Sequence, residues 1–423
     1  MDRKTFLKSA SLILGGGIAP SALATNFKIE ADKEIRISEG PYLTAVDKTE
    51  ATVVFMTNKR AIAKVEVVSN DDANFAKPKA FFDSDESLGR KHIGTLHTVQ
   101  LYGLKPNMTY SYKIEVIEVI EFWEEKRGIK YGSTKLGTPL RCDKYPKTDV
   151  QLSLKTLSDN NEDFSFFVIN DVHEKSNMAE RMLSNMSDER FLVLNGDMSH
   201  TYKNETHIFK AFMSSISNTC KGGLPIFYAR GNHECRGKYS EPFMRYFPST
   251  TGKTYYMFNH ADTAFLFLDL CEDKPDNHVE CGNITDFQSY KEKESEWLKK
   301  VISSEEFKNA KRRIAIMHIL PFDLSNWKFA KDVNKFFGNI LNEANIDLAI
   351  CGHFHKQMIV NKNSFYKGRG RKGEIGSIKV KFPIFVNSNT DSVKVSVSKD
   401  GIKLKVFSDK DSSVKEFNVN NFV

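Results

Sequence analysis

Five apolar runs in this 423-residue chain each end in Asp, Asn or His, and this repeated ending constrains the fold more than any other feature. The runs and their endings are Phe166–Asn170 before Asp171-Val172-His173, Phe191–Asn195 before Gly196-Asp197, Phe227–Arg230 before Gly231-Asn232-His233-Glu234, Ile314–Met317 before His318, and Leu348–Cys351 before Gly352-His353-Phe354-His355. Short apolar runs bounded by turn residues indicate buried strands. Because open α/β sheets place their ligands at the carboxyl ends of the strands, we expect these endings to come together.

The part of the chain from residue 164 to 423 alternates between such strands and helical patterns, which predicts an α/β domain. The helical patterns cover residues 176–186, 206–216, 288–302 and 332–344. Further strands are expected near the end of the chain, at residues 382–386, 393–398 and 403–407. A second domain is expected before residue 164, because 423 residues exceed what one ordinary core holds.

Residues 35–140 consist of short β-type runs separated by turns, which predicts a small antiparallel β-sandwich. This region shows no cluster of residues suited to metal binding or catalysis, and packing is its expected role. Residues 141–163 are rich in Asp, Asn, Lys and Ser, and we expect them to be a linker between the two domains.

Residues 1–24 are typical of an export signal peptide. Basic residues precede the apolar run 10–19, and Ala22-Leu23-Ala24 fits a small-x-small cleavage site. The segment around Arg3-Lys4 also resembles a twin-arginine signal, with Lys in place of the second Arg. The protein is therefore expected to be exported, either periplasmic or secreted.

The charge and the hydropathy of the chain limit the kinds of partner that it is expected to have. The net charge of +7 is mildly basic, which suits a phosphate-bearing small molecule and does not require a nucleic acid. No run of 18 apolar residues follows the N-terminal segment, so no membrane span is expected.

The strand endings supply carboxylate, amide and imidazole groups in the proportions that a pair of divalent metal ions needs. The seven candidate ligands are Asp171, His173, Asp197, Asn232, His318, His353 and His355. A single His at a strand end is more often structural, but five such endings in series indicate one site. Carboxylates suit harder ions and imidazoles suit Zn and Fe. Two adjacent ions activate a shared water and stabilise both oxygens of an in-line phosphoryl displacement.

The order Asp-x-His, Gly-Asp, Gly-Asn-His-Glu, His and Gly-His-x-His resembles the calcineurin-like metallophosphoesterases, over residues 164–390. Three segments of the N-terminal region, at residues 40–43, 52–55 and 104–106, resemble the fibronectin-like domain of purple acid phosphatases. The resemblance implies an N-terminal β-sandwich followed by a four-layer αββα metallophosphoesterase domain.

By this resemblance, the seven ligands divide between two ions, which would be Mn, Fe or Zn. Asp171, His173, Asp197 and His355 are expected to hold the first ion; Asp197 also bridges to the second, held by Asn232, His318 and His353. The resemblance implies hydrolysis by a metal-bound hydroxide. Its catalytic residues are Asp197 and His233, and His233 is expected to polarise the phosphate and protonate the leaving oxygen.

Two positions depart from the purple acid phosphatase pattern. Those enzymes have Asp-x-Gly at the first strand ending and a Tyr three residues after the Gly-Asp aspartate, and that Tyr binds ferric iron and gives the colour. Here His173 replaces the Gly and His200 stands at the Tyr position, with Tyr202 two residues further on. The sequence therefore predicts a colourless enzyme in which His173 takes a ligand place.

The expected substrate is a small phosphate ester, with monoesters slightly favoured over diesters. Residues expected to contact it are His200, Asn232, His233 and Arg236. The alternative is a non-catalytic cell-surface binding module that retains the phosphoesterase scaffold. A metallopeptidase is disfavoured because the chain lacks a His-Glu-x-x-His motif.

Overall fold

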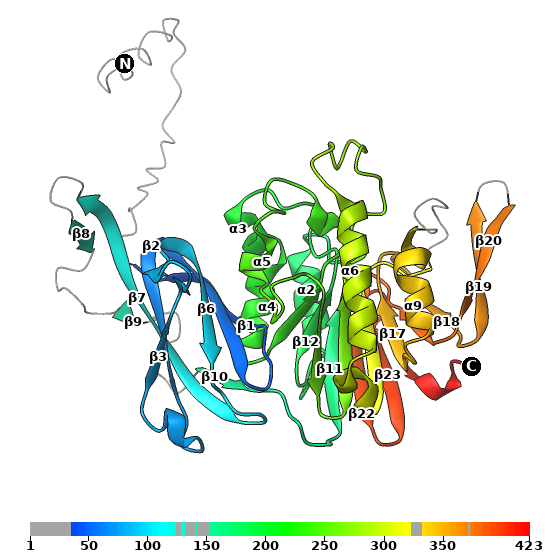
Figure 1. The fold of residues 1–423 in the computed structure, drawn as a ribbon, viewed down its shortest axis with the longest axis horizontal. Helices are drawn as coiled ribbons and strands as arrows, with labels where there is room; N and C mark the ends of the chain where they lie inside the picture. Colours follow the sequence, from blue (N-terminus) through cyan, green and yellow to red (C-terminus); the bar gives the residue numbers. More distant parts are fainter. Residues whose placement is uncertain (1–34, 124–127, 132–139, 142–151, 323–331, 371–372) are drawn as a thin grey trace, which may run out of the picture. The chain divides into compact units, whose positions relative to one another are not determined.

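The structure, a computed structural model, describes residues 35–123, 128–131, 140–141, 152–322, 332–370 and 373–423 (Figure 1). The expected export signal, residues 1–24, lies outside the described residues. So does part of the expected linker, residues 142–151. The described chain from Ile35 to Val423 forms one unit.

The N-terminal region is β-rich, as predicted, and is built on one long strand, β2. The first part of β2 pairs with β1 and β6, and its second part pairs with β3 and β7. The strands of this sheet are β1 (Ile37–Thr44), β2 (Glu50–Val68), β3 (Lys79–Phe82), β6 (Gly94–Tyr102), β7 (Thr109–Trp123), β8 (Gly128–Tyr131), β9 (Leu140–Arg141) and β10 (Leu152–Lys155). A two-stranded ladder joins β4 (Ser84–Asp85) and β5 (Arg90–Lys91).

Strand β10 lies within the stretch expected to be a linker. It pairs antiparallel with β7, and Leu152 and Leu154 are both buried. The sequence Leu-Ser-Leu-Lys alternates apolar and polar residues as a half-buried strand does. This signal is only four residues long and is surrounded by polar residues, which conceal it.

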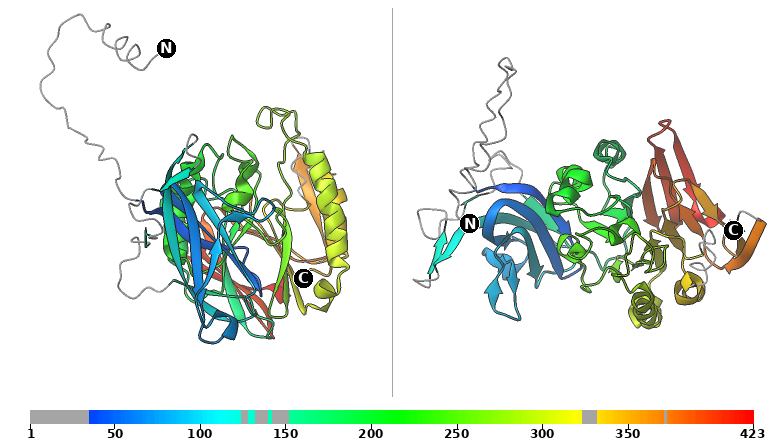
Figure 2. Two further views of the ribbon diagram at one scale, coloured as in Figure 1. Left: turned by 60° about the vertical axis from the view of Figure 1, so that its left-hand side comes forward. Right: turned by 90° about the horizontal axis from the view of Figure 1, so that it is seen from above.

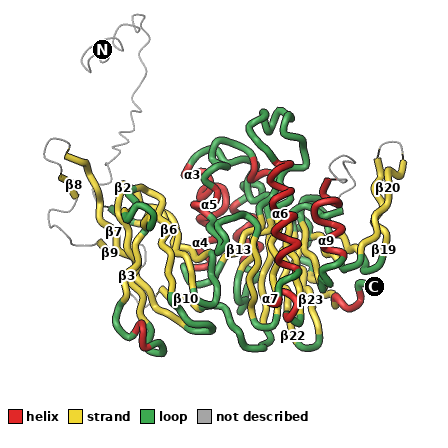
Figure 3. Tube along the Cα trace, in the orientation of Figure 1, coloured by secondary structure: helices red, strands yellow, loops and turns green. Residues whose placement is uncertain are grey.

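The C-terminal domain contains two mixed six-stranded sheets. The first sheet has the order β13 (Ile226–Ala229), β12 (Leu192–Asn195), β11 (Phe164–Ile169), β22 (Asp391–Ser398), β23 (Gly401–Ser408) and β24 (Val414–Asn418). The second has the order β14 (Tyr256–His260), β15 (Thr263–Leu268), β16 (Arg312–Met317), β17 (Leu348–Cys351), β21 (Ile384–Val386) and β18 (Met358–Val360). A hairpin of β19 (Ser364–Gly370) and β20 (Gly373–Val380) projects from the domain (Figures 1 and 3).

Successive residues of a strand point to opposite faces of its sheet, so they pack in different layers of the domain. Phe166 of β11 packs in one core cluster with Phe265 of β15, so this core lies between the two sheets. The neighbouring Phe167 packs in a second cluster with residues of α2 and α4, and Leu266 packs in a third with Leu298 of α6. Helices thus cover the outer face of each sheet, which gives the four layers predicted (Figure 2).

The α-helices lie where the sequence predicts helical patterns, with additional short turns. They are α2 (Ser176–Leu183), α3 (Glu205–Ile208), α4 (Ser214–Cys220), α5 (Phe243–Tyr246), α6 (Phe287–Ile302), α7 (Glu305–Asn309) and α9 (Asn339–Asn342). Wider helical turns at Phe209–Met213 and Asn334–Gly338 continue α3 into α4 and lead into α9. Within the described residues, no helix is long and apolar enough to cross a membrane.

His260, the last residue of β14, is a titratable group buried at the base of the domain. Its Nδ1 accepts a hydrogen bond of 3.1 Å from the backbone N–H of Ser158, and its ring packs edge-on against Phe164. Burial, helped by the charge of Arg190, lowers the pKa of His260 to about 3. Glu162 lies 3.8 Å from Nε2 but is partly exposed and does not offset the burial.

The buried imidazole of His260 predicts that the folded protein loses stability as the pH falls. The unfolded chain binds a proton at His260 near the ordinary histidine pKa of 6.5, whereas the folded chain does so only near 3. The stability that the neutral His260 contributes is therefore complete above pH 6.5. It is lost as the pH falls from 6.5 toward about 3. Relative to His260→Gln, the wild type should lose up to about 1.4 kcal/mol of unfolding free energy per pH unit. Urea titrations across the window test this, and a difference that does not change with pH contradicts it.

Candidate metal centre

The five strand endings meet at one place. Strands β11, β12 and β13 are parallel neighbours in the first sheet, as β16 and β17 are in the second. The N–H of Asp171 donates to the carbonyl of Gly196 at 3.0 Å, and that of Gly352 donates to the carbonyl of His318 at 2.9 Å. His318 Nδ1 lies 2.7 Å from the carbonyl oxygen of Asn195, which links the two sheets. Because Nδ1 donates this bond, Nε2 is left to bind an ion.

Five of the seven candidate ligands have a left-handed backbone. The φ angles are +52° at Asp171, +48° at His173, +52° at Asp197, +70° at His353 and +55° at His355. Residues other than glycine rarely adopt this conformation, and it concentrates at functional sites. The sharp turns carry each side chain off the strand end toward the common centre.

The first group of candidate ligand atoms comes from Asp171, His173 and His355, three of the four residues expected to hold the first ion. Nε2 of His355 lies 3.2 Å from Oδ1 of Asp171, and Nε2 of His173 lies 3.7 Å from the same oxygen. The two imidazole nitrogens are 3.0 Å apart. Three ligand atoms from β11 and β17 therefore surround one point.

The second group contains Asp197, His318 and His353, with Asn232 beside it. Nε2 of His318 lies 3.0 Å from Oδ2 of Asp197, and Nδ1 of His353 lies 3.1 Å from Oδ1 of Asn232. Nε2 of His318 is also 3.8 Å from Oδ1 of Asp171, which belongs to the first group. The two groups are thus adjacent, as a pair of bridged ions requires.

Several buried polar atoms of these groups fit a bound cation. Within the described structure, Oδ1 of Asp171 and Nε2 of His318 are buried and make no hydrogen bond. The facing Nε2 atoms of His173 and His355 could both turn a lone pair toward an ion when neither carries the proton. The amide oxygen of Asn232 faces only acceptors, so hydrogen bonding alone favours the swapped amide. The oxygen-inward orientation is the one that a metal ligand needs.

The electrostatics of the centre favour a cation. Burial alone would lower the pKa of His318, but the carboxylates of Asp197 and Asp171 raise it to about 10. Burial raises the pKa of Asp197, yet the charge of His318 outweighs it and the pKa falls below the usual value. Burial lowers the pKa of His173 to about 4, which keeps this imidazole neutral and able to bind metal.

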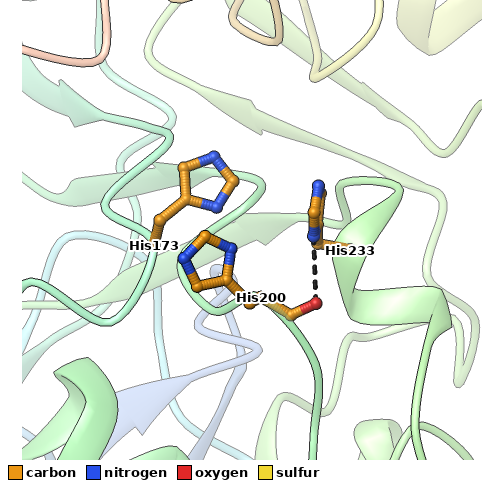
Figure 4. A group of neighbouring side chains, drawn as sticks. All are labelled: His173, His200 and His233. Carbon is orange, nitrogen blue, oxygen red and sulfur yellow. Dashed lines mark hydrogen bonds between the residues drawn. The ribbon is translucent and has the colours of Figure 1, made fainter.

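Three histidines gather at the edge of the centre: His173, His200 and His233 (Figure 4). The rings of His173 and His200 stack with centroids 4.6 Å apart. Nδ1 of His233 lies 2.9 Å from the carbonyl oxygen of His200, and its backbone N–H donates to Oδ1 of Asp197. Nε2 of His233 lies 3.8 Å from Oδ2 of Asp197. The structure thus brings the predicted catalytic His233 beside the metal ligands.

Glu234 is a structural member of the site that the sequence reasoning left without a role. Its buried carboxylate accepts hydrogen bonds from the backbone N–H groups of Asp197, Met198 and Gly231, at 2.8–2.9 Å. A Cβ on Gly231 would lie 2.3 Å from Oδ1 of Asp197, so only glycine fits there. The glutamate that ends the Gly-Asn-His-Glu motif was the sequence feature from which this contact could have been predicted.

Arg236, predicted to bind substrate, is held by a second residue that the sequence reasoning missed, Glu272. Nε and Nη2 of Arg236 donate to the two carboxylate oxygens of Glu272 at 2.5 and 2.9 Å. Its Nη1 lies 3.2 Å from Nδ1 of His233. Glu272 follows an apolar strand without any motif, so the sequence carried no signal for it.

Comparison with known proteins assigns the class of the C-terminal domain. Residues 164–357 match the model of the calcineurin-like phosphoesterase family. The matched segment contains all seven candidate ligands and His233. Residues 164–357 therefore form a calcineurin-like metallophosphoesterase domain, which belongs to the class of phosphoric ester hydrolases. A search by sequence finds no match among curated proteins.

Solved structures of known proteins align with this chain. A purple acid phosphatase from yellow lupin (Lupinus luteus) seeds aligns with a TM-score of 0.58 and 13% identity, over 89% of this chain and 73% of that chain. GAP50, the anchor in the inner membrane complex of Plasmodium, aligns with a TM-score of 0.41 and 15% identity, over 60% of this chain and 89% of that chain. The likeness to the lupin enzyme shows a shared fold, including a β-rich region before the phosphoesterase domain.

The adjacency of the two ligand groups predicts a graded loss of metal. The wild type should retain two ions after dialysis, His318→Ala should retain one, and Asp197→Ala should weaken both because its carboxylate is expected to bridge them. Elemental analysis of the dialysed proteins measures this. His278→Ala, which lies outside both groups, is the control and should match the wild type. Two tightly held ions in Asp197→Ala would contradict the bridge.

The absence of a phenolate predicts a colourless iron form. Tyr202, two residues beyond His200, is buried with its hydroxyl 3.4 Å from that of Tyr228. The iron-loaded wild type should therefore show no intense visible charge-transfer band, whereas His200→Tyr should gain one. Absorption spectra of both proteins test this, and a strong band in the wild type refutes it.

Proposed function

We propose that this protein hydrolyses small phosphate esters with two divalent metal ions, and that monoesters are slightly favoured over diesters. The observation that carries the proposal is the adjacency of two ligand groups with His233 at their edge. A purely structural ion would need one closed group and no titratable side chain beside it.

The residues present suit Mn, Fe or Zn, because they combine carboxylate, amide and imidazole donors. Asp171, His173 and His355 would hold one ion; Asn232, His318 and His353 would hold the other, with Asp197 between them. When bound, such a pair supplies a nucleophilic water at neutral pH and neutralises charge on the phosphoryl oxygens.

His233 is placed to serve the leaving group. Its Nδ1 donates to the carbonyl of His200, so Nε2 is the nitrogen presented to the centre. A proton held on Nε2 can pass to the departing oxygen as the P–O bond breaks. The backbone bond from His233 to Asp197 fixes this imidazole relative to the ions.

Two further residues expected to contact the substrate lie near the ligand groups. His200 is exposed and stacks on His173, while Asn232 borders the second group. Imidazole and amide donors at these places can hydrogen-bond to phosphate oxygens. Export of the protein, predicted from residues 1–24, is part of the same proposal.

Hydrolysis of chromogenic esters tests the function. Purified protein loaded with Mn, Fe(II) or Zn is assayed with p-nitrophenyl phosphate, bis-p-nitrophenyl phosphate and an alkyl phosphate. We expect turnover of the monoester, and a loss of about 100-fold or more in kcat for the alkyl ester in His233→Ala, because an alkoxide leaves poorly without a proton. The loss with p-nitrophenyl phosphate should be smaller.

His278→Ala serves as the matched histidine control and should behave as the wild type. Better turnover of the diester would reassign the substrate class. Two bound ions without turnover of any ester would contradict the proposal and favour the non-catalytic binding module.

A further inference from the structure

Glu272 and Arg236 form a rigid pair behind the phosphoesterase centre. The carboxylate of Glu272 is fully buried, and the Arg236 side chain is only 11% exposed. Two nitrogens of the guanidinium donate to the two oxygens of Glu272, which fixes the plane of the arginine. A bidentate pair buried in this way has little freedom to turn toward a ligand.

The third guanidinium nitrogen lies against the ring of His233. Nη1 of Arg236 is 3.2 Å from Nδ1 and 3.3 Å from Nε2 of His233, so it lies beside the ring rather than at one nitrogen. Because Nδ1 already meets the carbonyl oxygen of His200, the imidazole is held between two fixed groups. Arg236 therefore adds a second fixed group beside the ring, next to the carbonyl of His200.

Glu272 also reaches the metal ligands. Nδ2 of Asn232 lies 3.5 Å from Oε1 of Glu272, at the long limit of a hydrogen bond. The same carboxylate accepts from the backbone N–H of Asp273 and from Lys274 Nζ. Glu272 therefore joins the loop after β15 to both Asn232 and Arg236, which precede and follow His233 in the chain.

We propose that Glu272 and Arg236 are positioning residues that hold Nε2 of His233 where the leaving oxygen departs. The inference rests on the proposed function. In the step concerned, the oxygen of a water molecule bonds to phosphorus, gives up a proton to solvent, and the bond from phosphorus to the leaving oxygen breaks. The electron pair of the broken bond stays on the leaving oxygen and takes the proton from Nε2 of His233, which leaves the ring neutral with its proton on Nδ1. Arg236 and Glu272 exchange no proton and act only by fixing the imidazole.

Leaving-group dependence distinguishes positioning from general structural support. A displaced general acid slows an ester whose leaving group needs a proton and has little effect on one whose leaving group departs as a stable anion. Glu272→Gln should lower kcat about tenfold for the alkyl phosphate and less than about threefold for p-nitrophenyl phosphate, with KM nearly unchanged. Arg236→Lys should give the same selective loss, because lysine cannot make the bidentate contact.

Two further variants isolate the pathway through His233. In the His233→Ala background, Glu272→Gln should cause no additional selective loss, since groups that act as one unit are not additive. Glu241→Gln, an exposed glutamate five residues beyond Arg236, is the matched control and should resemble the wild type. Thermal melting identifies any variant that is unfolded, and Glu272→Asp then replaces Glu272→Gln.

A crystal structure of Glu272→Gln provides a readout apart from turnover: the ring of His233 should be displaced or take more than one position. Equal losses for both esters, a selective loss that persists in the His233→Ala background, or an unmoved His233 ring overturns the inference while leaving the proposed function intact. No turnover by the wild type overturns both.

Discussion

Two buried carboxylates, Asp171 and Asp197, control the arrangement of the centre. Removing an ionised carboxylate from water is costly unless nearby positive charge or hydrogen bonds compensate it. Here the compensation comes from imidazoles on other strand ends, and His318 lies within 3.8 Å of both carboxylates. The raised pKa of His318 is the consequence, because its proton takes the place that a cation would fill. Metal binding would release this proton and couple ion affinity to pH.

The need to hold these carboxylates in place explains the conformation of the backbone around the centre. The N–H of Asp197 donates to Glu234, and Asp197 Oδ1 accepts from the N–H of His233, so two loops are tied together. Glycine at 196 and 231 is required because a Cβ at either position would come within 2.5 Å of an atom of His318 or Asp197. The strained turns persist because these contacts over-determine them.

The sequence predicted the five strands that precede the candidate ligands, the longer helices and the candidate ligands themselves, because apolar runs and chemistry-bearing endings are local patterns. It did not predict strands β14, β15, β19, β20 and β24. It predicted the four layers only through the family resemblance, since alternation alone does not identify which sheets face each other. Strand β10 was hidden by its polar surroundings. Glu272 and the contacts of Glu234 were not predictable, because both depend on which loops meet after folding.

Arg236 illustrates how the structure refines a prediction made from nearness in the sequence. Arginine beside a phosphate site suggests a fork that grips phosphate oxygens. Its fork is instead directed at Glu272, and Nη2 also lies 3.3 Å from Glu280, so carboxylates already balance the charge of the guanidinium. Nη1 lies against the ring of His233. The influence of Arg236 on a phosphate ester would therefore pass through the orientation of one imidazole, which makes it selective for the leaving group.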